Sequence, residues 1–269
     1  MHAASRDALS HAAESIDAIV GDDVAKAAAT GAELFELVEF LDAERQLRLA
    51  LADQASEGQQ RCDLTDQLFG GKLAQPTLDA LKTAVSQNWS TPRELRDGLV
   101  LLARRALLRG AQAEGQLAQV EDELFQLARI LEDEPKLVQL LGEKMVAPDR
   151  RRQLAAAVLY GKVTKYTEAL VLQVIGRPEH DAIDDVDTLV HQVAEFSGHD
   201  VAHVVSAGEV SAGQRAQLAE KLGRIYGREM RVHTEIDPEL LGGVTVKVGN
   251  ELIDGSLRGR IARLRAELV

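Results

Sequence analysis

The stretch from Ile236 to Leu268 constrains the fold of this sequence more than any other. Three valines alternate with polar residues in it, which is the period of a half-buried β-strand. A turn dipeptide that accepts positive φ follows, so two apolar residues can return as a short paired strand. Small capping residues then precede apolar residues at the spacing of one helical face, which predicts a final amphipathic helix. These parts are, in order, Val244–Val248, Gly249-Asn250, Leu252-Ile253, Asp254–Ser256 and Leu257–Leu268.

The residues around this hairpin resemble the C-terminal motif of the δ subunits of F-type ATP synthases. Asp237–Val244 reads Asp-Pro-Glu-Leu-Leu-Gly-Gly-Val, and Ile253–Leu264 reads Ile-Asp-Gly-Ser-Leu-Arg-Gly-Arg-Ile-Ala-Arg-Leu. The same family includes the mitochondrial oligomycin-sensitivity-conferring protein. The resemblance implies no catalytic residue, but it implies partner-binding residues, which we call the C-terminal signature. The signature consists of Pro238, Gly242, Gly243, Ile253, Asp254, Gly255, Ser256, Leu257, Arg258 and Leu264.

The same resemblance implies a non-catalytic stator subunit with no cofactor. In that family a helical bundle caps the catalytic head by binding N-terminal helices of the α subunits, and the C-terminal domain holds the b subunits of the peripheral stalk. Such a subunit couples proton translocation to ATP synthesis because it resists the torque that would turn the head with the rotor. It reaches a membrane only through its partners, and we expect it at the cytoplasmic face of a bacterial cell membrane.

Composition narrows the classes of partner. The formal net charge of −12 argues against nucleic acid or an anionic membrane as the main partner. The single cysteine, Cys62, excludes an internal disulfide and a metal site built from cysteines alone. The first twenty residues are acidic and lack a continuous apolar core, so they resemble neither a secretory signal nor a transit peptide.

The N-terminal two thirds of the sequence predict helices. Aromatic residues make up only 3% of the chain, and alanine and leucine recur at helical spacing. Thr91-Pro92 with Glu94 reads as a helix start, in which the Glu94 carboxylate can reach back to a free amide. The helix that follows is too long to be unbroken, so we expect an interruption between Gly110 and Gly115 and an end at Pro135. Short helices of this kind must pack on one another as a bundle.

An internal repeat divides this helical part. Residues shifted by 90 positions, as from Leu34 to Leu124, match without a gap, which favours duplication over chance alignment of leucine-rich helices. The matched set is Leu34-Phe35, Leu37, Leu41, Glu44, Leu47, Leu51, Arg61, Leu64, Gly71-Lys72 and Thr77 with Leu124-Phe125, Leu127, Leu131, Glu134, Leu137, Leu141, Arg151, Leu154, Gly161-Lys162 and Thr167.

We therefore predict an α+β protein that is mostly helical, with two related N-terminal bundles and a small C-terminal α/β domain. The predicted domains are an extra bundle at 1–98, a δ-type bundle at 99–198 and the α/β domain at 199–269. After a helix that closes near Phe196, the last domain reads strand, helix, strand, strand, helix with mixed pairing. The stretch from Ala103 onwards matches the usual length of a δ subunit, so the first bundle departs from the family pattern.

The search for chemistry finds little. Gly242-Gly243 lies before a strand and lacks the rest of a phosphate loop, so it reads as flexible backbone at a strand entrance. His199 and His203 lie in an extended stretch, where positions four apart are too distant for one metal ion. Turn or cap chemistry already explains Asp237 and Asp254. The basic run Arg150–Arg152 reads first as a solvated face and second as a surface for an acidic partner.

Two rival functions remain open. A generic helical adaptor would fit residues 1–200, because bundles rich in alanine and leucine have shallow grooves that suit an amphipathic guest helix, but it leaves the C-terminal motif unexplained. An enzyme that uses the carboxylates of Asp237, Glu239 and Asp254 is the rival from another class.

Overall fold

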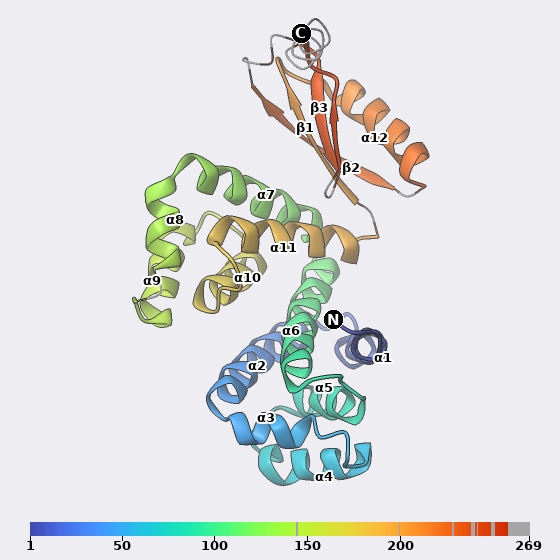
Figure 1. Cartoon of the computed structure of the whole chain (residues 1–269), viewed down its shortest axis with the longest axis vertical. Helices are drawn as coiled ribbons and strands as arrows, with labels where there is room; N and C mark the ends of the chain where they lie inside the picture. The colour runs from blue at the N-terminus through green and yellow to red at the C-terminus, as the bar shows by residue number, and fades with distance from the viewer. Residues whose placement is uncertain are drawn as a thin grey trace, which may run out of the picture. The chain divides into compact units, whose positions relative to one another are not determined.

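The chain folds into two compact units, Met1–Leu189 and Val190–Val269, which we call unit 1 and unit 2. Helices make up the regular structure of unit 1, and unit 2 carries a β-sheet (Figure 1). The prediction of a mostly helical chain with a small C-terminal α/β domain is therefore confirmed. The computed structural model describes residues 1–143, 145–198, 200–227, 229–237, 240, 242–248 and 251–257, apart from the side chains of 200 and 201.

The helices begin and end at the residues that the sequence marks. Gly115 has a φ of 69° between α6 and α7, and Pro135 begins α8 directly after α7, so both predicted interruptions are confirmed. The helices are α1 (Ala3–Val20), α2 (Val24–Ala43), α3 (Arg45–Leu51), α4 (Gly58–Phe69), α5 (Gln75–Ser86), α6 (Pro92–Ala113), α7 (Leu117–Asp133), α8 (Pro135–Gly142), α9 (Pro148–Leu159), α10 (Lys165–Gly176) and α11 (Ala182–Phe196).

The helix boundaries recur at the shift of the sequence repeat. The bounds of α4 and α9, and those of α5 and α10, each differ by 90 positions at both ends. We call α1–α6 the first bundle and α7–α10 with the start of α11 the second bundle. The predicted domain boundary between 98 and 99 falls inside α6, which packs against α2 and α5 on one side and also contacts α7 and α10. The division into three domains stays a prediction.

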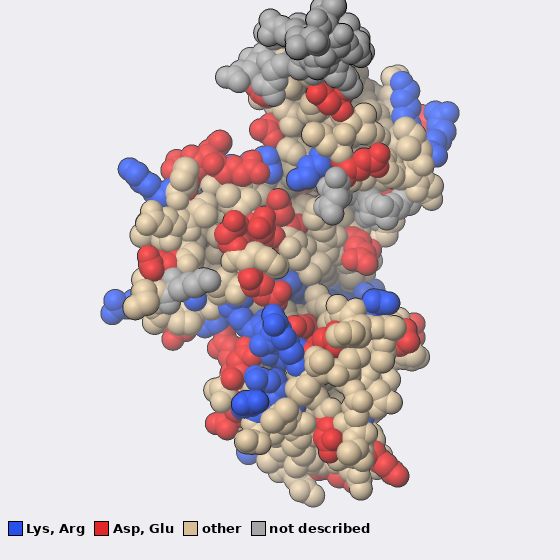
Figure 2. Space-filling model, viewed as in Figure 1, with Lys and Arg blue, Asp and Glu red and all other residues tan. Residues whose placement is uncertain are grey.

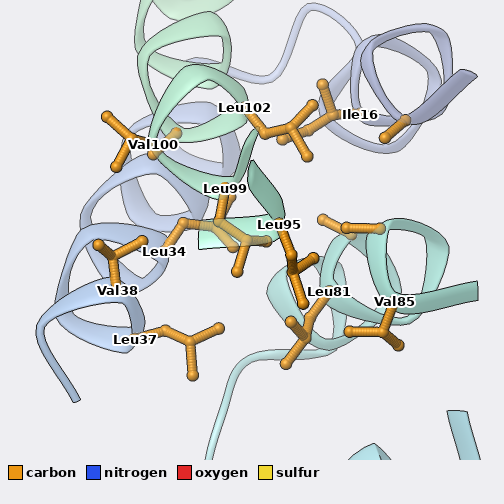
Figure 3. Close-up of a cluster of buried hydrophobic side chains, with 14 of the residues drawn as sticks. Ile16, Leu34, Leu37, Val38, Leu81, Val85, Leu95, Leu99, Val100 and Leu102 are labelled. Atoms are coloured by element: carbon orange, nitrogen blue, oxygen red, sulfur yellow. The ribbon is translucent and has the colours of Figure 1, made fainter. Parts of the chain in front are cut away.

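The core of the first bundle forms around α6. Leucines 95, 99 and 102 of α6 are at most 1% exposed and face Ile16 of α1 and Leu34 of α2 (Figure 3). Trp89 lies beside them at 1% exposure, and its ring occupies the place where a Cβ on Gly98 would stand, 2.2 Å from Cη2. A glycine on α6 therefore makes room for the single tryptophan of the chain.

The start of α6 differs in one respect from its prediction. Thr91 caps the helix as expected, since its hydroxyl accepts from the amide of Glu94 at 3.1 Å. The Glu94 carboxylate accepts from the hydroxyl of Thr91 at 3.5 Å at its own helix start, but its shorter hydrogen bonds are with the start of α1. It accepts from the amide of His2 at 2.6 Å and from the hydroxyl of Ser5 at 3.0 Å, because α1 begins beside it. Burial pushes the pKa of Glu94 upward, but the hydrogen bonds from His2 and Ser5 outweigh it and lower the pKa to about 2.

This carboxylate makes stability depend on pH. Its pKa in the folded chain lies below the ordinary 4.5, so its contribution is fully present above pH 4.5 and is lost as the pH falls towards 2. We expect Glu94→Gln to lower the free energy of unfolding at pH 7 by an amount on the order of 2 kcal/mol, and to flatten the acid limb of the stability curve. Urea denaturation followed by Trp89 fluorescence at pH 7 and pH 3 measures both effects. Parallel curves for the two proteins would contradict this role.

The described part of unit 2 that follows α11 is a four-stranded mixed sheet with the helix α12 packed on it. The strand order is β2-β1-β3-β4, with β1 and β2 parallel and the other two pairs antiparallel. The helix between β1 and β2 begins with a capping box of Ser211 and Gln214 and ends at Gly227 with a φ of 71°. The elements are β1 (Asp200–Ser206), α12 (Ala212–Tyr226), β2 (Met230–Ile236), β3 (Val244–Val248) and β4 (Glu251–Asp254).

The predicted faces of the valine strand are confirmed. Val246 and Val248 are buried with Ala202, Val204, Leu222 and Met230, whereas Lys247 is exposed. The predicted order strand, helix, strand, strand is also confirmed. The Gly249-Asn250 turn lies outside the described residues, as does the final helix beyond Leu257.

Candidate partner-binding site

The described part of the C-terminal signature comes together at the open end of the β3–β4 hairpin. The amide of Leu257 donates to the carbonyl of Gly242 at 2.9 Å, and the amide of Gly255 donates to the carbonyl of Val244 at 3.0 Å. Residues at the start of β3 and just before it therefore lie beside residues that follow β4. Pro238, Arg258 and Leu264 lie outside the described residues.

The glycine pair at this end is closely packed rather than loose. Gly243 has a φ of 81°, and a Cβ there would stand 2.5 Å from the carbonyl oxygen of Gly255 and 3.0 Å from the Cα of Ser256. Gly242 has a φ of 146°, and a Cβ there would stand 2.8 Å from Cδ1 of Leu257. The two glycines allow the backbone and side chain that follow β4 to lie against them. This replaces the expectation of flexible backbone at a strand entrance.

Asp254 and Ser256 hold the same corner by hydrogen bonds. Oδ1 of Asp254 accepts from the amide of Ser256 at 2.9 Å and from its hydroxyl at 2.7 Å, and Ser256 is only 1% exposed. The predicted turn or cap chemistry of Asp254 is therefore confirmed. Asp237 donates its amide to Ser206 across the strand ends at 2.8 Å, and Glu239 lies outside the described residues. The described contacts of these acids are those of a structural corner.

The exposed members of the signature are apolar. Ile253 is 41% exposed and Leu257 is 46% exposed, and Leu252 beside them on β4 is 66% exposed. β4 pairs only with β3 among the described strands, so Leu252 and Ile253 lie on an edge strand, and Leu257 follows three residues after its end. Ile253 and Leu257 are thus the described signature residues whose side chains are available to a partner. The sequence motif did not single out Leu252, although its place on a short edge strand is a sign of exposure.

The basic run on α9 is not a uniform solvated face. Arg151 is only 6% exposed, and Arg152 is paired with Glu39 and Asp149, the latter at 2.9 Å. Arg150 is exposed, as expected. Successive helix positions point about 100° apart, so three consecutive arginines meet three different environments. The first interpretation of this run is therefore wrong for Arg151, which is buried, whereas Arg152 is partly exposed and ion-paired.

A charge cluster joins the two bundles within unit 1. Asp42 of α2 accepts from Nε of Arg177 at 2.8 Å and from Arg96 of α6 at 3.0 Å. Arg96 and Arg177 also contact Asp97, at 2.7 and 3.4 Å. Figure 2 shows basic and acidic side chains intermingled around α2 and α6. Sequence reasoning missed this cluster because its members are up to 135 positions apart.

We also searched the described residues for metal-ligating groups and for helices that could span a membrane. These residues contain no group of three or more metal-ligating side chains, and His203 is paired with Glu235 at 3.0 Å. His199 lies outside the described part of the chain. Among the residues searched, no helix is long and apolar enough to span a membrane.

Comparison with known proteins finds a matching protein family. The model of the ATP synthase delta (OSCP) subunit family matches residues 104–268. ATP synthase subunit delta of Corynebacterium efficiens is 56% identical over 99% of this chain and 98% of its own length. The proteins of the same name from Corynebacterium glutamicum strain R and Corynebacterium diphtheriae are 55% and 53% identical, and the alignments cover 99% and 100% of each chain.

These full-length matches extend through residues 1–103, so the relatives share the first bundle that the family model leaves out. A chain in the mitochondrial ATP synthase hexamer of Toxoplasma gondii aligns over 61% of this chain and 94% of its own, at 16% identity and a TM-score of 0.35. That score is too low to support an argument about the fold.

Proposed function

This chain belongs to the ATP synthase delta (OSCP) subunit family, and from that premise we propose that it ties the catalytic head of an F-type ATP synthase to the b subunits of its peripheral stalk. The chain is a non-catalytic stator component of the synthase. In the proposal, unit 1 binds N-terminal helices of the α subunits and unit 2 binds b. The chain then meets the membrane only through these partners, at the cytoplasmic face of a bacterial cell.

The observation that carries the proposal is the full-length similarity to proteins named ATP synthase subunit delta. The charge cluster around Asp42 supports it, because a subunit that resists torque must not let its bundles rotate against each other. Partly buried ion pairs among several charges hold geometry better than isolated surface pairs. The net charge of −12 gives no support to a nucleic-acid partner.

In this proposal the three predicted domains bind different parts of the synthase. The extra bundle at 1–98 offers a second surface for a helix of the head or the stalk, the bundle at 99–198 is the usual docking module, and the domain at 199–269 holds b. In the last domain, Ile253 and Leu257 supply exposed apolar contact area. The other described signature residues, Gly242, Gly243, Asp254, Gly255 and Ser256, form the closely packed corner that positions those two side chains.

A reconstitution experiment tests the coupling role. Membrane vesicles from a strain that lacks this subunit should hydrolyse ATP but should not acidify their lumen, because the head turns with the rotor. Adding the purified chain should restore ATP-driven proton pumping at least fivefold. Equal pumping with and without the chain would contradict the stator function.

The partner assignment is tested with a variant of the same chain. Ile253→Asp combined with Leu257→Asp places two charges at the exposed edge without entering the core. We expect this chain to bind the isolated head as the unaltered chain does, but to restore less than a fifth of the pumping. Normal pumping by the variant would remove these residues from the stalk contact. Loss of head binding would contradict the assignment of the head to unit 1.

A further inference from the structure

The two bundles of unit 1 are connected covalently at one end of α6. α6 ends at Ala113, Gly115 follows with a φ of 69°, and α7 begins at Leu117. The same end carries an ion pair of Glu114 with Lys165, the first residue of α10, at 2.7 Å. Helix α10 of the second bundle therefore starts beside the covalent connection.

From this point α10 runs along α6 in the opposite direction. Tyr166, near the start of α10, packs against the last turn of α6. Midway, Nε of Arg104 donates to the side-chain oxygen of Gln173 at 2.9 Å, a contact between two long side chains. Just past the end of α10, Arg177 contacts Asp97 near the start of α6 at 3.4 Å. Three contacts along α10 therefore hold the second bundle against α6.

The Tyr166 end of this contact is buried and closely packed. Tyr166 is 1% exposed, and a Cβ on Gly110 of α6 would stand 3.0 Å from its Cε1 and 3.3 Å from Cβ of Ala27 on α2. A glycine and an alanine thus let the ring lie against α6 beside α2. Because van der Waals packing holds this end, salt should affect it little.

The opposite end is held by charges that solvent reaches. Arg177 donates to Asp42 of α2 at 2.8 Å and to Asp97 of α6 at 3.4 Å, and the Arg177 side chain is 17% exposed. Arg152 of α9 pairs with Glu39 of α2, and these side chains are 24% and 51% exposed. Such pairs weaken as salt rises, because the screening length falls from about 10 Å at 0.1 M to about 3 Å at 1 M. The two ends of α10 therefore respond differently to salt.

We propose that the ion pairs of Arg177 and Arg152 with the first bundle form a latch, and that the second bundle tilts on the first about a hinge at Gly115 and Tyr166 when the latch opens. The hinge combines the covalent connection with the buried contact, so the bundles stay together while the angle between them changes. A partner whose charges compete for Arg177 would open the latch, which would let binding on one bundle affect the other. The latch operates in the free chain, so it does not depend on the proposed function.

Distances between spin labels on the two bundles measure this angle. Gln67 of α4 and Ala157 of α9 are exposed and lie at equivalent positions of the repeat, and both can be changed to cysteine in a full chain that carries Cys62→Ala. The distance distribution should be narrow at about 0.1 M salt and at least twofold wider at about 1 M, because salt opens the latch. An equal width at both concentrations would overturn the proposal, and this comparison leaves every latch residue unaltered.

Removing the latch charges should widen the distribution at low salt. We expect Arg152→Met combined with Arg177→Met to give the wide distribution at about 0.1 M salt, with little further change at about 1 M. Arg93→Met combined with Arg150→Met is the matched control. It also removes one arginine from each bundle, but Arg93 pairs with Asp97 on its own helix and Arg150 is exposed. A narrow distribution in the latch variant, or equal widening in the control, would contradict the latch.

A second pair of labels tests the hinge. Ala25 near the start of α2 and Lys162 just before α10 are exposed and lie at the Tyr166 end of the contact. The distance between labels on cysteines at these two positions should keep its width when salt or substitution opens the latch. If this pair widens as much as the first pair, the bundles separate rather than tilt, and the hinge is wrong.

Discussion

Replacing Arg61 by methionine should lower the free energy of unfolding of the first bundle by about 3 kcal/mol, whereas Arg151→Met should change the stability of the second bundle by less than about 1 kcal/mol. Arg61 donates to five carbonyls, two in the loop after α3 and three at the C-terminal end of α5, and its removal takes this shared donor from all of them. Arg151 makes one long hydrogen bond among the described residues, so its replacement loses little hydrogen bonding. The replacement also removes two buried donors that have no partner.

The two bundles can be followed separately in urea denaturation. Trp89 is the only tryptophan and is buried in the first bundle, so its fluorescence reports on Arg61→Met. Methyl resonances of Leu159 in α9 and Ile175 in α10 report on Arg151→Met, because both residues line a small apolar cavity inside the second bundle. Arg61→Lys serves as a control that keeps the charge but replaces the planar fork of five donors by an ammonium with three. Equal destabilisation by the two methionine variants would show that the repeats hold their arginines in the same way.

The contrast between these arginines shows how far the sequence repeat could predict the structure. The repeat predicted matching positions, and the helix boundaries of α4 and α9 recur at the same shift of 90. Boundaries depend on local signals such as proline, glycine and capping residues, which duplication preserves. The hydrogen-bond partners of Arg61 and Arg151 depend on loop conformation and on neighbouring side-chain size, so sequence matching did not show that they differ.

Contacts between distant segments account for most of what the sequence did not predict. The Glu94 carboxylate was expected to serve its own helix but accepts from His2 and Ser5, which lie 92 and 89 positions away. The cluster of Asp42 with Arg96 and Arg177 likewise has no local pattern. Charged residues on a helix surface read as solvated from periodicity alone, because periodicity describes one helix and not the helix packed against it.

The C-terminal signature shows the opposite case, in which the motif was visible and its physical reason was not. The sequence marked Gly242 and Gly243 as unusual, and the structure shows that each faces residues that follow β4. Such an approach joins two parts of a hairpin, so it appears in sequence only as glycine at fixed spacing. One substitution can test whether the motif stabilises the fold or contacts the partner.

Gly243→Ala should destabilise unit 2 by about 3 kcal/mol. A φ of 81° is strained for alanine, and the added Cβ would stand 2.5 Å from the carbonyl oxygen of Gly255, a backbone atom that cannot turn aside. The β3–β4 corner would have to open, which would also strain the hydrogen bond between Gly255 and Val244. Urea denaturation followed by methyl resonances of Val246 and Val248, which are buried in the core of unit 2, measures the loss.

Gly208→Ala is the matched control, since Gly208 is exposed in unit 2 and a Cβ there would meet no atom within 4 Å. Its stability should change by less than about 0.5 kcal/mol. If Gly243→Ala destabilises unit 2 and Gly208→Ala does not, close packing is sufficient to explain this glycine, and partner contact falls to the exposed Ile253 and Leu257. If both variants are as stable as the unaltered chain but Gly243→Ala alone fails to restore proton pumping, the glycine pair itself lies in the partner interface.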